Sequence, residues 1–440
     1  MKLFKNFVRF VVSHREKTKN LFKNIFLLGS ANFIEQILFF ILYVWIARKF
    51  DPQQYGYFFT ALVFSRIAFR ISEFGINTVI TRDISRNHEL APSYLGNIFT
   101  LRGFICVMTL FLIQPLIYII GYEHPIIISV EFLSIYIIIW GFSQSIGAAF
   151  RGLERQDIVA LIIVSGIIPL FMLLGLALMA GTTIHTIEFL FILGAGIQLY
   201  VGYMLMTHLV GKFKLSYDIG LWKKTLKDSL PLGLAGMFAL VYFRIDTLIL
   251  SFYFPQGKIV GLYNTAYNIF VALTFLPFIF YQIALPLFSR LALKSLSKLR
   301  SYYYYSLFGI GLCAFSISAA VFFCAKPLTF FVYGEKYLAS VEALKILSPA
   351  SILTSLGFVS MSVLTALNLS KKLLKATFVA VITNIVLNLI LIPHLGMTGA
   401  AVNTIITEGT FFAICSRDIA LFFNRAQRAD YCVSLKSTEV

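Results

Sequence analysis

The sequence has little charge and few marks of soluble-enzyme chemistry. Charged residues make up 13% of its 440 positions, hydrophobic residues make up 59%, and the mean hydropathy is +0.83. Its five cysteines show no paired spacing, so neither a disulfide framework nor a CxxC site is indicated. The six histidines form no metal-ligand pattern, and phosphate-loop, GxSxG and HExxH motifs are absent. We therefore expect no catalytic residues, no metal and no cofactor.

What the sequence does contain is a series of long apolar runs. Each has about 20 residues or more, which is enough to cross a bilayer as a helix. The runs predict an all-α polytopic membrane protein with twelve spans. These are expected near residues 24–46, 57–80, 95–120, 126–149, 158–180, 184–210, 229–252, 260–287, 303–325, 341–367, 374–393 and 398–423.

Basic residues are distributed unevenly between the segments that connect these runs. With the N-terminus placed in the cytoplasm, inside segments hold 26 lysines and arginines, outside loops hold 5, and spans hold the other 6. This is the positive-inside pattern, and it predicts that both termini are cytoplasmic. The net charge of +17 is therefore a signal of topology and of contact with anionic membrane lipids. We expect no nucleic-acid partner.

Two pairs of similar segments indicate an internal duplication. WIARKFDPQQYGYFFTALVF (45–64) and LILSFYFPQGKIVGLYNTAYNIF (248–270) share an aromatic-Pro-Gln turn between two spans, and 151–175 and 367–391 share a short basic turn after a span. Six spans per half imply parallel repeats about an axis along the membrane normal. The predicted domains are a basic cytoplasmic N-terminal segment at 1–23, an N-lobe at 24–210, a cytoplasmic inter-lobe loop at 211–228, a C-lobe at 229–423 and a cytoplasmic tail at 424–440.

Three charged side chains interrupt the second predicted span. Arg66, Arg70 and Glu73 lie at steps of four and three, so they share one face of a helix, and Asn77 continues the stripe. Charges in a span normally turn toward a partner or a wet cavity and often mark a substrate path. Two arginines on this stripe favour an anionic cargo. The alternative is that Glu73 pairs with the arginines and locks the span.

Several segments together carry a resemblance to a known family. RIDTLILSFYFPQGKIVGLYNTAYNIF (244–270) resembles the C-half hallmark of polysaccharide transporters, the O-antigen flippase (Wzx-type) family of the multidrug/oligosaccharidyl-lipid/polysaccharide (MOP) exporter superfamily. The matching residues are Asp246, Gly261, Tyr263, Asn264 and Ala266. FDPQQYGYFFTALVF, SEFGINTVITRDIS and GMTGAAVNTIITEGT resemble further parts of the family in the same order.

The resemblance implies a MOP/MATE-like fold of two six-helix lobes around a central cavity, and a function. A member would flip an undecaprenyl-diphosphate-linked oligosaccharide, such as an O-antigen unit used in lipopolysaccharide, from the cytoplasmic to the periplasmic leaflet of the bacterial inner membrane. Alternating access between the lobes would move the cargo. Expected partners are membrane lipids, a polysaccharide polymerase and a chain-length regulator.

The candidate site residues fall into three groups. A diphosphate needs cations, and the planar fork of arginine suits phosphate oxygens, which selects Arg66, Arg70 and Arg244. Coupling to H⁺ or Na⁺, or gating, is assigned to Glu35, Glu73 and Asp246. Sugar contacts are assigned to Asn264, Tyr267, Asn268, Asn384 and Asn388.

Several of these assignments keep a structural alternative. The asparagines serve equally well as hydrogen bonds between helices. Arg244 and Asp246 are about 200° apart on an ideal helix, so either the helix is distorted or the two residues face different neighbours.

Other functions remain as alternatives. A peptidoglycan-precursor flippase shares the superfamily, and so does a drug/cation antiporter, although an antiporter would favour acidic cavity faces. A major-facilitator transporter would carry a Gly-Asp-Arg-Gly-type loop after its second span, which TRDISRNHELAPSYLGN does not. A membrane-embedded polymerase or glycosyltransferase would usually have a large outside loop or an outside acidic pair, whereas the outside loops here are short.

Overall fold

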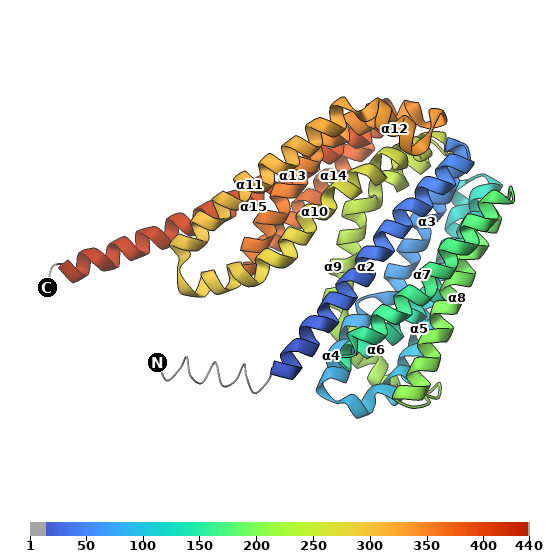
Figure 1. Cartoon of the computed structure of the whole chain (residues 1–440), viewed down its shortest axis with the longest axis horizontal. Coiled ribbons are helices and arrows are strands. Elements are labelled where there is room, and N and C mark those ends of the chain that lie inside the picture. Colours follow the sequence, from blue (N-terminus) through green and yellow to red (C-terminus); the bar gives the residue numbers. More distant parts are fainter. Residues whose placement is uncertain (1–14, 439–440) are drawn as a thin grey trace. The chain divides into compact units, whose positions relative to one another are not determined.

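The computed structural model describes residues 15–438, and every regular element in that part of the chain is a helix (Figure 1). Most of the predicted N-terminal segment, residues 1–14, and the last two residues of the predicted tail lie outside the described range. The elements are α2 (Arg15–Lys49), α3 (Pro52–Glu73), α4 (Ile76–Arg86), η1 (His88–Leu90), α5 (Ala91–Ile120), α6 (His124–Gly152), α7 (Gln156–Met179), α8 (Ile184–Leu209), α9 (Ile219–Tyr253), α10 (Lys258–Lys294), α11 (Leu296–Phe323), α12 (Ala325–Tyr333), η2 (Glu335–Ser340), α13 (Val341–Ala366), α14 (Ser370–Leu395) and α15 (Met397–Thr438).

The long helices make this a multi-pass α-helical membrane protein, as the sequence predicts. Twelve described helices have 22 residues or more. By length and composition, ten candidate spans are long and apolar enough to cross a membrane, and the polar α3 and the long α15 are not among them. Large apolar side chains such as Phe111, Ile119 and Phe308 are exposed on the helix sides, where lipid tails would cover them.

The structure departs from the predicted spans at four places. The predicted second span is broken into α3 and α4. The longest predicted outside loop is folded into the short helices α12 and η2. The first helix of the second half, α9, begins inside the predicted inter-lobe loop, at Ile219. The last helix, α15, continues into the predicted tail as far as Thr438.

The helices divide into two compact units. The first, unit 1, takes in the chain up to Phe50 and Ala61–Leu240, and the second, unit 2, takes in Asp51–Thr60 and the chain from Val241 onward. Two of the three boundaries, after residues 60 and 240, fall inside helices, so α3 and α9 each contribute to both units.

The core of unit 1 forms around α6. This helix packs against α4, α5, α7 and α8, and α2 packs against α7. Burial of aliphatic side chains such as Ile80, Leu95, Ile146 and Ile162 holds these helices together.

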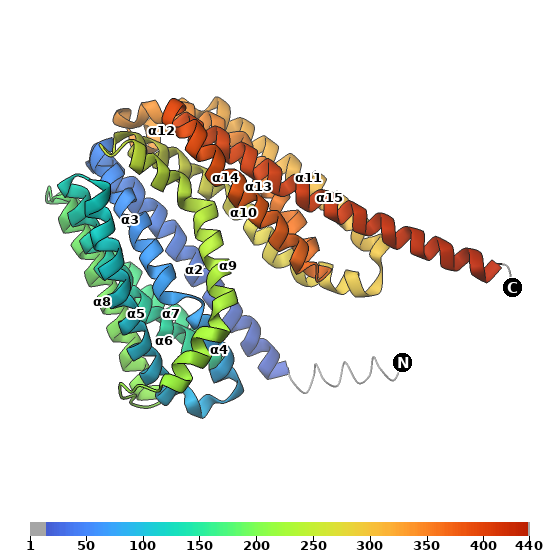
Figure 2. The same ribbon diagram turned by 180° about the vertical axis from the view of Figure 1, so that it is seen from behind.

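The core of unit 2 forms around α13. Figures 1 and 2 show from two sides that α10, α11, α13, α14 and α15 run side by side, and α13 contacts the other four. Seven hydroxyl residues of α13 bond to carbonyls three or four residues earlier in the same helix, and Ser360 also pairs with the Tyr303 hydroxyl of α11. The seven are Ser348, Ser351, Thr354, Ser355, Ser360, Ser362 and Thr365. Small residues with internally satisfied hydroxyls allow neighbouring helices to approach closely.

One pair of turns supports the predicted duplication. After α6, the N–H of Arg155 bonds to the carbonyl of Phe150 and that of Glu154 to Arg151, and Glu154 has a φ of 59°. After α13, Leu369 and Asn368 make the same two bonds, to Leu364 and Thr365, and Asn368 has a φ of 55°. Both turns are Schellman motifs, in which one left-handed residue ends the helix.

The other pair of similar segments meets directly. The starts of α3 and α10, which follow the two Pro-Gln turns, approach each other at Gly56 and Gly261 within unit 2. A Cβ on Gly56 would lie 1.8 Å from the carbonyl oxygen of Gly257, and a Cβ on Gly261 would lie 1.9 Å from that of Pro52. Only glycine fits at either position.

Candidate functional site

The turn between α3 and α4 is organised by Glu73. Phe74 and Gly75 leave the helix with φ of 35° and 80°, and α4 restarts at Ile76. The Glu73 carboxylate, 7% exposed, accepts hydrogen bonds from the N–H groups of Gly75 at 3.2 Å and Asn77 at 3.3 Å. It therefore caps the positive end of α4. Asn77 begins a new helix, so the predicted stripe from Arg66 to Asn77 does not lie on one continuous helix.

Guanidinium groups outnumber carboxylates around Glu73. Arg70 forms an ion pair with it, 3.6 Å from Nη1 to Oε2, and keeps 41% of its side chain exposed. The charge of Glu73 also acts on Arg102 of α5 and on Arg151 at the end of α6. Glu73 thus has one ion pair, to Arg70, and two further guanidinium groups in its electrostatic surroundings. Glu73 combines the pairing role that the sequence offered as an alternative with a capping role.

Arg102 is the functional candidate that the sequence analysis missed. It is 0% exposed, and its Nη1 donates to Asn77 Oδ1 at 3.2 Å and to Ser145 Oγ. Its guanidinium carbon lies 5.4 Å from the centre of the Phe69 ring, while Nε and Nη2 have no hydrogen-bond partner. A buried arginine is rare without a carboxylate in contact. In the sequence it is an isolated arginine in an apolar run, and only the fold brings its partners together.

Arg66 and Glu35 meet at a different helix. Both are half-buried, and neither forms a hydrogen bond or ion pair with another described residue. Their charges both act on the hydroxyl of Tyr136 on α6, so α2, α3 and α6 bring one cation and one carboxylate near the same tyrosine. Arg66 is therefore a cation without a committed partner in the described part of unit 1.

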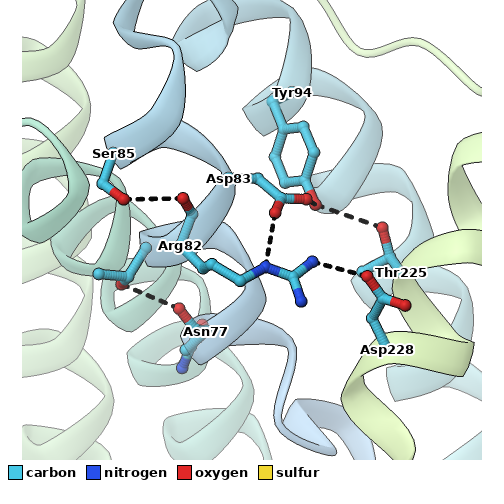
Figure 3. A network of polar contacts seen from close by, with 8 residues as sticks. Asn77, Arg82, Asp83, Ser85, Tyr94, Thr225 and Asp228 are labelled. Atoms are coloured by element: carbon cyan, nitrogen blue, oxygen red, sulfur yellow. Dashed lines mark hydrogen bonds and ion pairs between the residues drawn. The ribbon is translucent and has the colours of Figure 1, made fainter.

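A second network ties α4 to the start of α9 (Figure 3). The Arg82 guanidinium donates from Nε to Asp83 at 2.8 Å and from Nη2 to Asp228 at 2.6 Å. The Tyr94 hydroxyl of α5 donates to Asp83 at 3.1 Å and lies 3.4 Å from the Thr225 hydroxyl. Hydrogen bonds to Asp83 and then to Asp228 raise the pKa of Arg82 above its ordinary value, so its charge is fixed. The predicted site contained none of these residues.

Arg244 and Asp246 of α9 contact two tyrosines of α10, Tyr267 and Tyr263, which lie one helical turn apart. Asp246, 5% exposed, accepts hydrogen bonds from the Tyr263 hydroxyl and from the N–H of Thr247 at 2.7 Å. The guanidinium carbon of Arg244 lies 5.4 Å from the centre of the Tyr267 ring. The two residues therefore have different partners on the same neighbouring helix.

The residues predicted to contact sugars are buried and mostly hydrogen-bonded within unit 2. The Tyr267 hydroxyl donates to the Phe243 carbonyl at 2.8 Å. Asn264 accepts from the Thr247 hydroxyl at 3.3 Å, and Asn268 donates to the Tyr55 hydroxyl at 3.2 Å. Asn388 donates to Asn384 at 2.9 Å and retains one oxygen without a partner. In this conformation Asn264, Tyr267 and Asn268 join α10 to other helices, whereas the bond between Asn384 and Asn388 lies within α14.

The described residues contain no cluster of three or more histidine, cysteine, aspartate or glutamate side chains that could hold a metal ion. What unit 1 presents instead is an excess of guanidinium groups on α3, α5 and α6, close to a carboxylate-capped turn.

The fold is that of MOP-superfamily transporters. A solved multidrug resistance MATE family transporter of the MOP superfamily, in its inward-facing conformation, matches with a TM-score of 0.69 at 15% identity over 90% of this chain and 96% of its own. The lipid II flippase MurJ, in an inward closed conformation, matches with a TM-score of 0.67 at 17% identity over 90% of this chain and 87% of its own. At these identities the likeness concerns the fold.

The sequence itself gives the family. Residues 21–292 match the model of the polysaccharide biosynthesis protein family, and the chain belongs to that family. No curated protein matches the sequence. The resemblance and the fold class expected from the sequence are both confirmed.

Proposed function

We propose that this protein is a flippase that carries a polyprenyl-diphosphate-linked oligosaccharide from the cytoplasmic to the periplasmic leaflet of the bacterial inner membrane by alternating access. Membership of a polysaccharide biosynthesis family supports the glycan, and the MOP fold supports transport without chemical conversion of the cargo. The observation that carries the proposal is the excess of arginine within unit 1. A diphosphate leaving water needs cations in a low-dielectric place, and an excess of guanidinium groups supplies them.

Arg66, Arg70 and Arg244 bind the diphosphate in this proposal. Arg66 has no hydrogen bond or ion pair to give up among the described residues. Arg70 is partly exposed and its ion pair with Glu73 is 3.6 Å long, so a phosphate can compete with Glu73 for it. The guanidinium carbon of Arg244 lies 5.4 Å from the centre of the Tyr267 ring, and a planar guanidinium matches the geometry of phosphate oxygens.

Glu73 gates, and Glu35 and Asp246 are the candidates for H⁺ or Na⁺ coupling. If a phosphate binds Arg70 in place of Glu73, the carboxylate that caps α4 loses its ion pair. Cargo binding is thereby linked to the turn between α3 and α4. The membrane potential assists an outward-moving anion by about 2.3 kcal/mol per charge per 100 mV when that charge crosses uncompensated. Sugar contacts by Asn264, Tyr267, Asn268, Asn384 and Asn388 require that some of their present hydrogen bonds open.

A peptidoglycan-precursor flippase is the second candidate. The lipid II flippase MurJ shares the fold, and its named cargo is a lipid as well. A drug/cation antiporter is disfavoured, because the arginine excess would repel a cationic drug. In the favoured proposal a polysaccharide polymerase and a chain-length regulator act on the delivered cargo, and both termini are cytoplasmic.

The test is translocation of a defined cargo by the purified protein in liposomes. A labelled polyprenyl-diphosphate oligosaccharide becomes protected from an impermeant glycosidase when it is translocated into the liposome. The rate of this protection would be measured for Arg66→Ala and Arg70→Ala, with Lys371→Ala as an exposed control. Loss of a charged hydrogen bond costs about 1.5–3 kcal/mol, so each variant should be roughly tenfold slower or more, and the control should match the unmodified protein.

If both arginine variants translocate at the unmodified rate, the cationic site is rejected. If lipid II is translocated and the oligosaccharide carriers are not, the second candidate replaces the first.

A further inference from the structure

A polar cavity lies beside the network of Figure 3, at the end of unit 1 that is predicted to be cytoplasmic. It has a volume of about 470 Å³, and Asp83, Arg86, Tyr94, Asn97, Asp218 and Lys224 line it. These residues come from α4, α5 and the start of α9. The volume falls within the range of small-molecule sites.

Both carboxylates of the cavity already accept hydrogen bonds from the protein. Asp83 accepts from Arg82 at 2.8 Å and from Tyr94 at 3.1 Å, and Figure 3 shows these groups converging from two helices. Asp218 accepts from the N–H of Leu221 at 3.1 Å and so caps the first turn of α9. The charge of Asp83 is therefore compensated by Arg82, and Asp218 serves as a helix cap.

The uncommitted groups of the cavity are two cations and one amide oxygen. Arg86 and Lys224 are exposed and form no hydrogen bond or ion pair with another described residue. Asn97 donates to the Ser93 carbonyl at 3.2 Å, while its buried Oδ1 has no partner. An anion that also carries a hydroxyl donor would satisfy all three groups.

We propose that this cavity binds a hydroxyl-bearing phosphate ester of a lipid headgroup. Arg86 and Lys224 hold the phosphate oxygens, and Asn97 Oδ1 accepts from a hydroxyl of the same headgroup. Basic pockets on the cytoplasmic side of membrane proteins suit such headgroups. Two sources share this chemistry, a bilayer phospholipid such as phosphatidylglycerol and a polyprenyl-diphosphate-linked sugar. The site does not depend on whether the chain transports a glycan.

The test measures lipid binding to the full-length purified protein by native mass spectrometry. Phosphatidylglycerol is titrated against the unmodified protein, the double variant Arg86→Gln/Lys224→Gln, and the matched double variant Lys223→Gln/Lys227→Gln. The second pair lies on the same helix segment and removes two positive charges without lining the cavity. We expect affinity to fall about tenfold or more in the first pair and to stay unchanged in the second.

Two further arms define the ligand. Phosphatidylethanol has the same charge without the glycerol hydroxyls, so the unmodified protein should prefer phosphatidylglycerol, and Asn97→Leu should abolish that preference. The titration is repeated with a polyprenyl-diphosphate sugar to identify the source of the headgroup. The Arg86→Gln/Lys224→Gln variant should lose affinity for each lipid that uses the cavity, whether that is the phospholipid, the polyprenyl-diphosphate sugar or both.

An equal loss of affinity in the Arg86→Gln/Lys224→Gln and Lys223→Gln/Lys227→Gln variants would mean that the lipid is attracted by the surface charge as a whole. That result would overturn the site. So would unchanged binding of both lipids in the Arg86→Gln/Lys224→Gln variant. Because the readout is binding, an inactive flippase would not affect either result. The midpoint of thermal unfolding in the same detergent shows that each variant is folded.

Discussion

The buried guanidinium of Arg102 is held by two neutral side chains rather than by a carboxylate in contact. Asn77 and Ser145 accept from one of its nitrogens, and two other nitrogens are buried without partners. Glu73 compensates the charge from a distance, and Gly141 provides the space, since a Cβ there would lie 3.0 Å from Nη2. Such a group costs folding free energy, so its contribution is expected in the electrostatics of unit 1 rather than in stability.

At this scale we predict opposite effects for two substitutions. Arg102→Met removes the charge and keeps much of the volume, while Asn77 and Ser145 retain their mutual hydrogen bond of 3.2 Å, so stability should be unchanged or higher. Asn77→Leu leaves the charge and removes an acceptor, which should cost about 1–3 kcal/mol. The midpoint of thermal unfolding in one detergent compares them. A lower midpoint for Arg102→Met than for Asn77→Leu would show that the charge itself stabilises the fold.

The turn between α3 and α4 shows how backbone conformation directs an element. Gly75 has a φ of 80°, and a Cβ on it would lie 2.7 Å from Leu232 Cβ and 2.8 Å from the backbone of Ser229 and Gly233, all on α9. The turn therefore needs glycine both for its conformation and for its close contact with α9. Glu73 can cap α4 only because the chain turns here.

At the scale of the element, Gly75→Ala can be compared with a matched control. Gly121, at the end of α5, also has a φ of 80°, but a Cβ there would meet nothing within 4 Å. Both substitutions carry the same conformational cost, and only Gly75→Ala adds a steric overlap, worth about 1–3 kcal/mol. The thermal midpoint should fall further for Gly75→Ala than for Gly121→Ala. Equal falls would mean that the contact with α9 yields without cost.

The contrast between helices and turns explains how far the sequence could be interpreted. Long apolar runs predicted the helices because the bilayer demands continuous apolar helices of known length. The break at Phe74 was not predicted, because a single glycine in an apolar run is compatible with a helix. Arg102 and the Arg82–Asp228 pair were missed for another reason. Their partners are distant in sequence, and a lone charge says nothing of what it will meet.

At the scale of the whole molecule, the distribution of basic residues predicts which side of the membrane each connecting segment faces. The predicted inside segments hold 26 lysines and arginines and the outside loops hold 5. The same bias predicts that the cavity lined by Arg86 and Lys224 lies at the cytoplasmic surface, where anionic lipids are found.

Orientation can be tested by labelling single cysteines. In a chain whose five native cysteines are replaced by serine, Lys336→Cys on η2 should react with an impermeant maleimide in intact cells. Tyr217→Cys, in the segment before α9, should react only after the inner membrane is made permeable. The reverse pattern would invert the topology and, with it, the proposed direction of transport.

The two turns that the sequence pairs have the same geometry, while the division into units follows neither predicted lobe boundary. The same Schellman turn ends α6 and α13. Residues 51–60 nevertheless belong with unit 2, and the units divide inside α3 and α9. Sequence patterns mark where a helix begins and ends, but they do not show which neighbours its two ends will have.

The approach of Gly56 to Gly261 has an evolutionary consequence. These glycines occupy corresponding places after the two Pro-Gln turns, and each lies against the backbone of the other's segment. If both halves descend from one ancestral gene, two copies of the ancestral protein would have contacted each other at this position when they paired. A side chain larger than hydrogen would then have been excluded before duplication as well as after it.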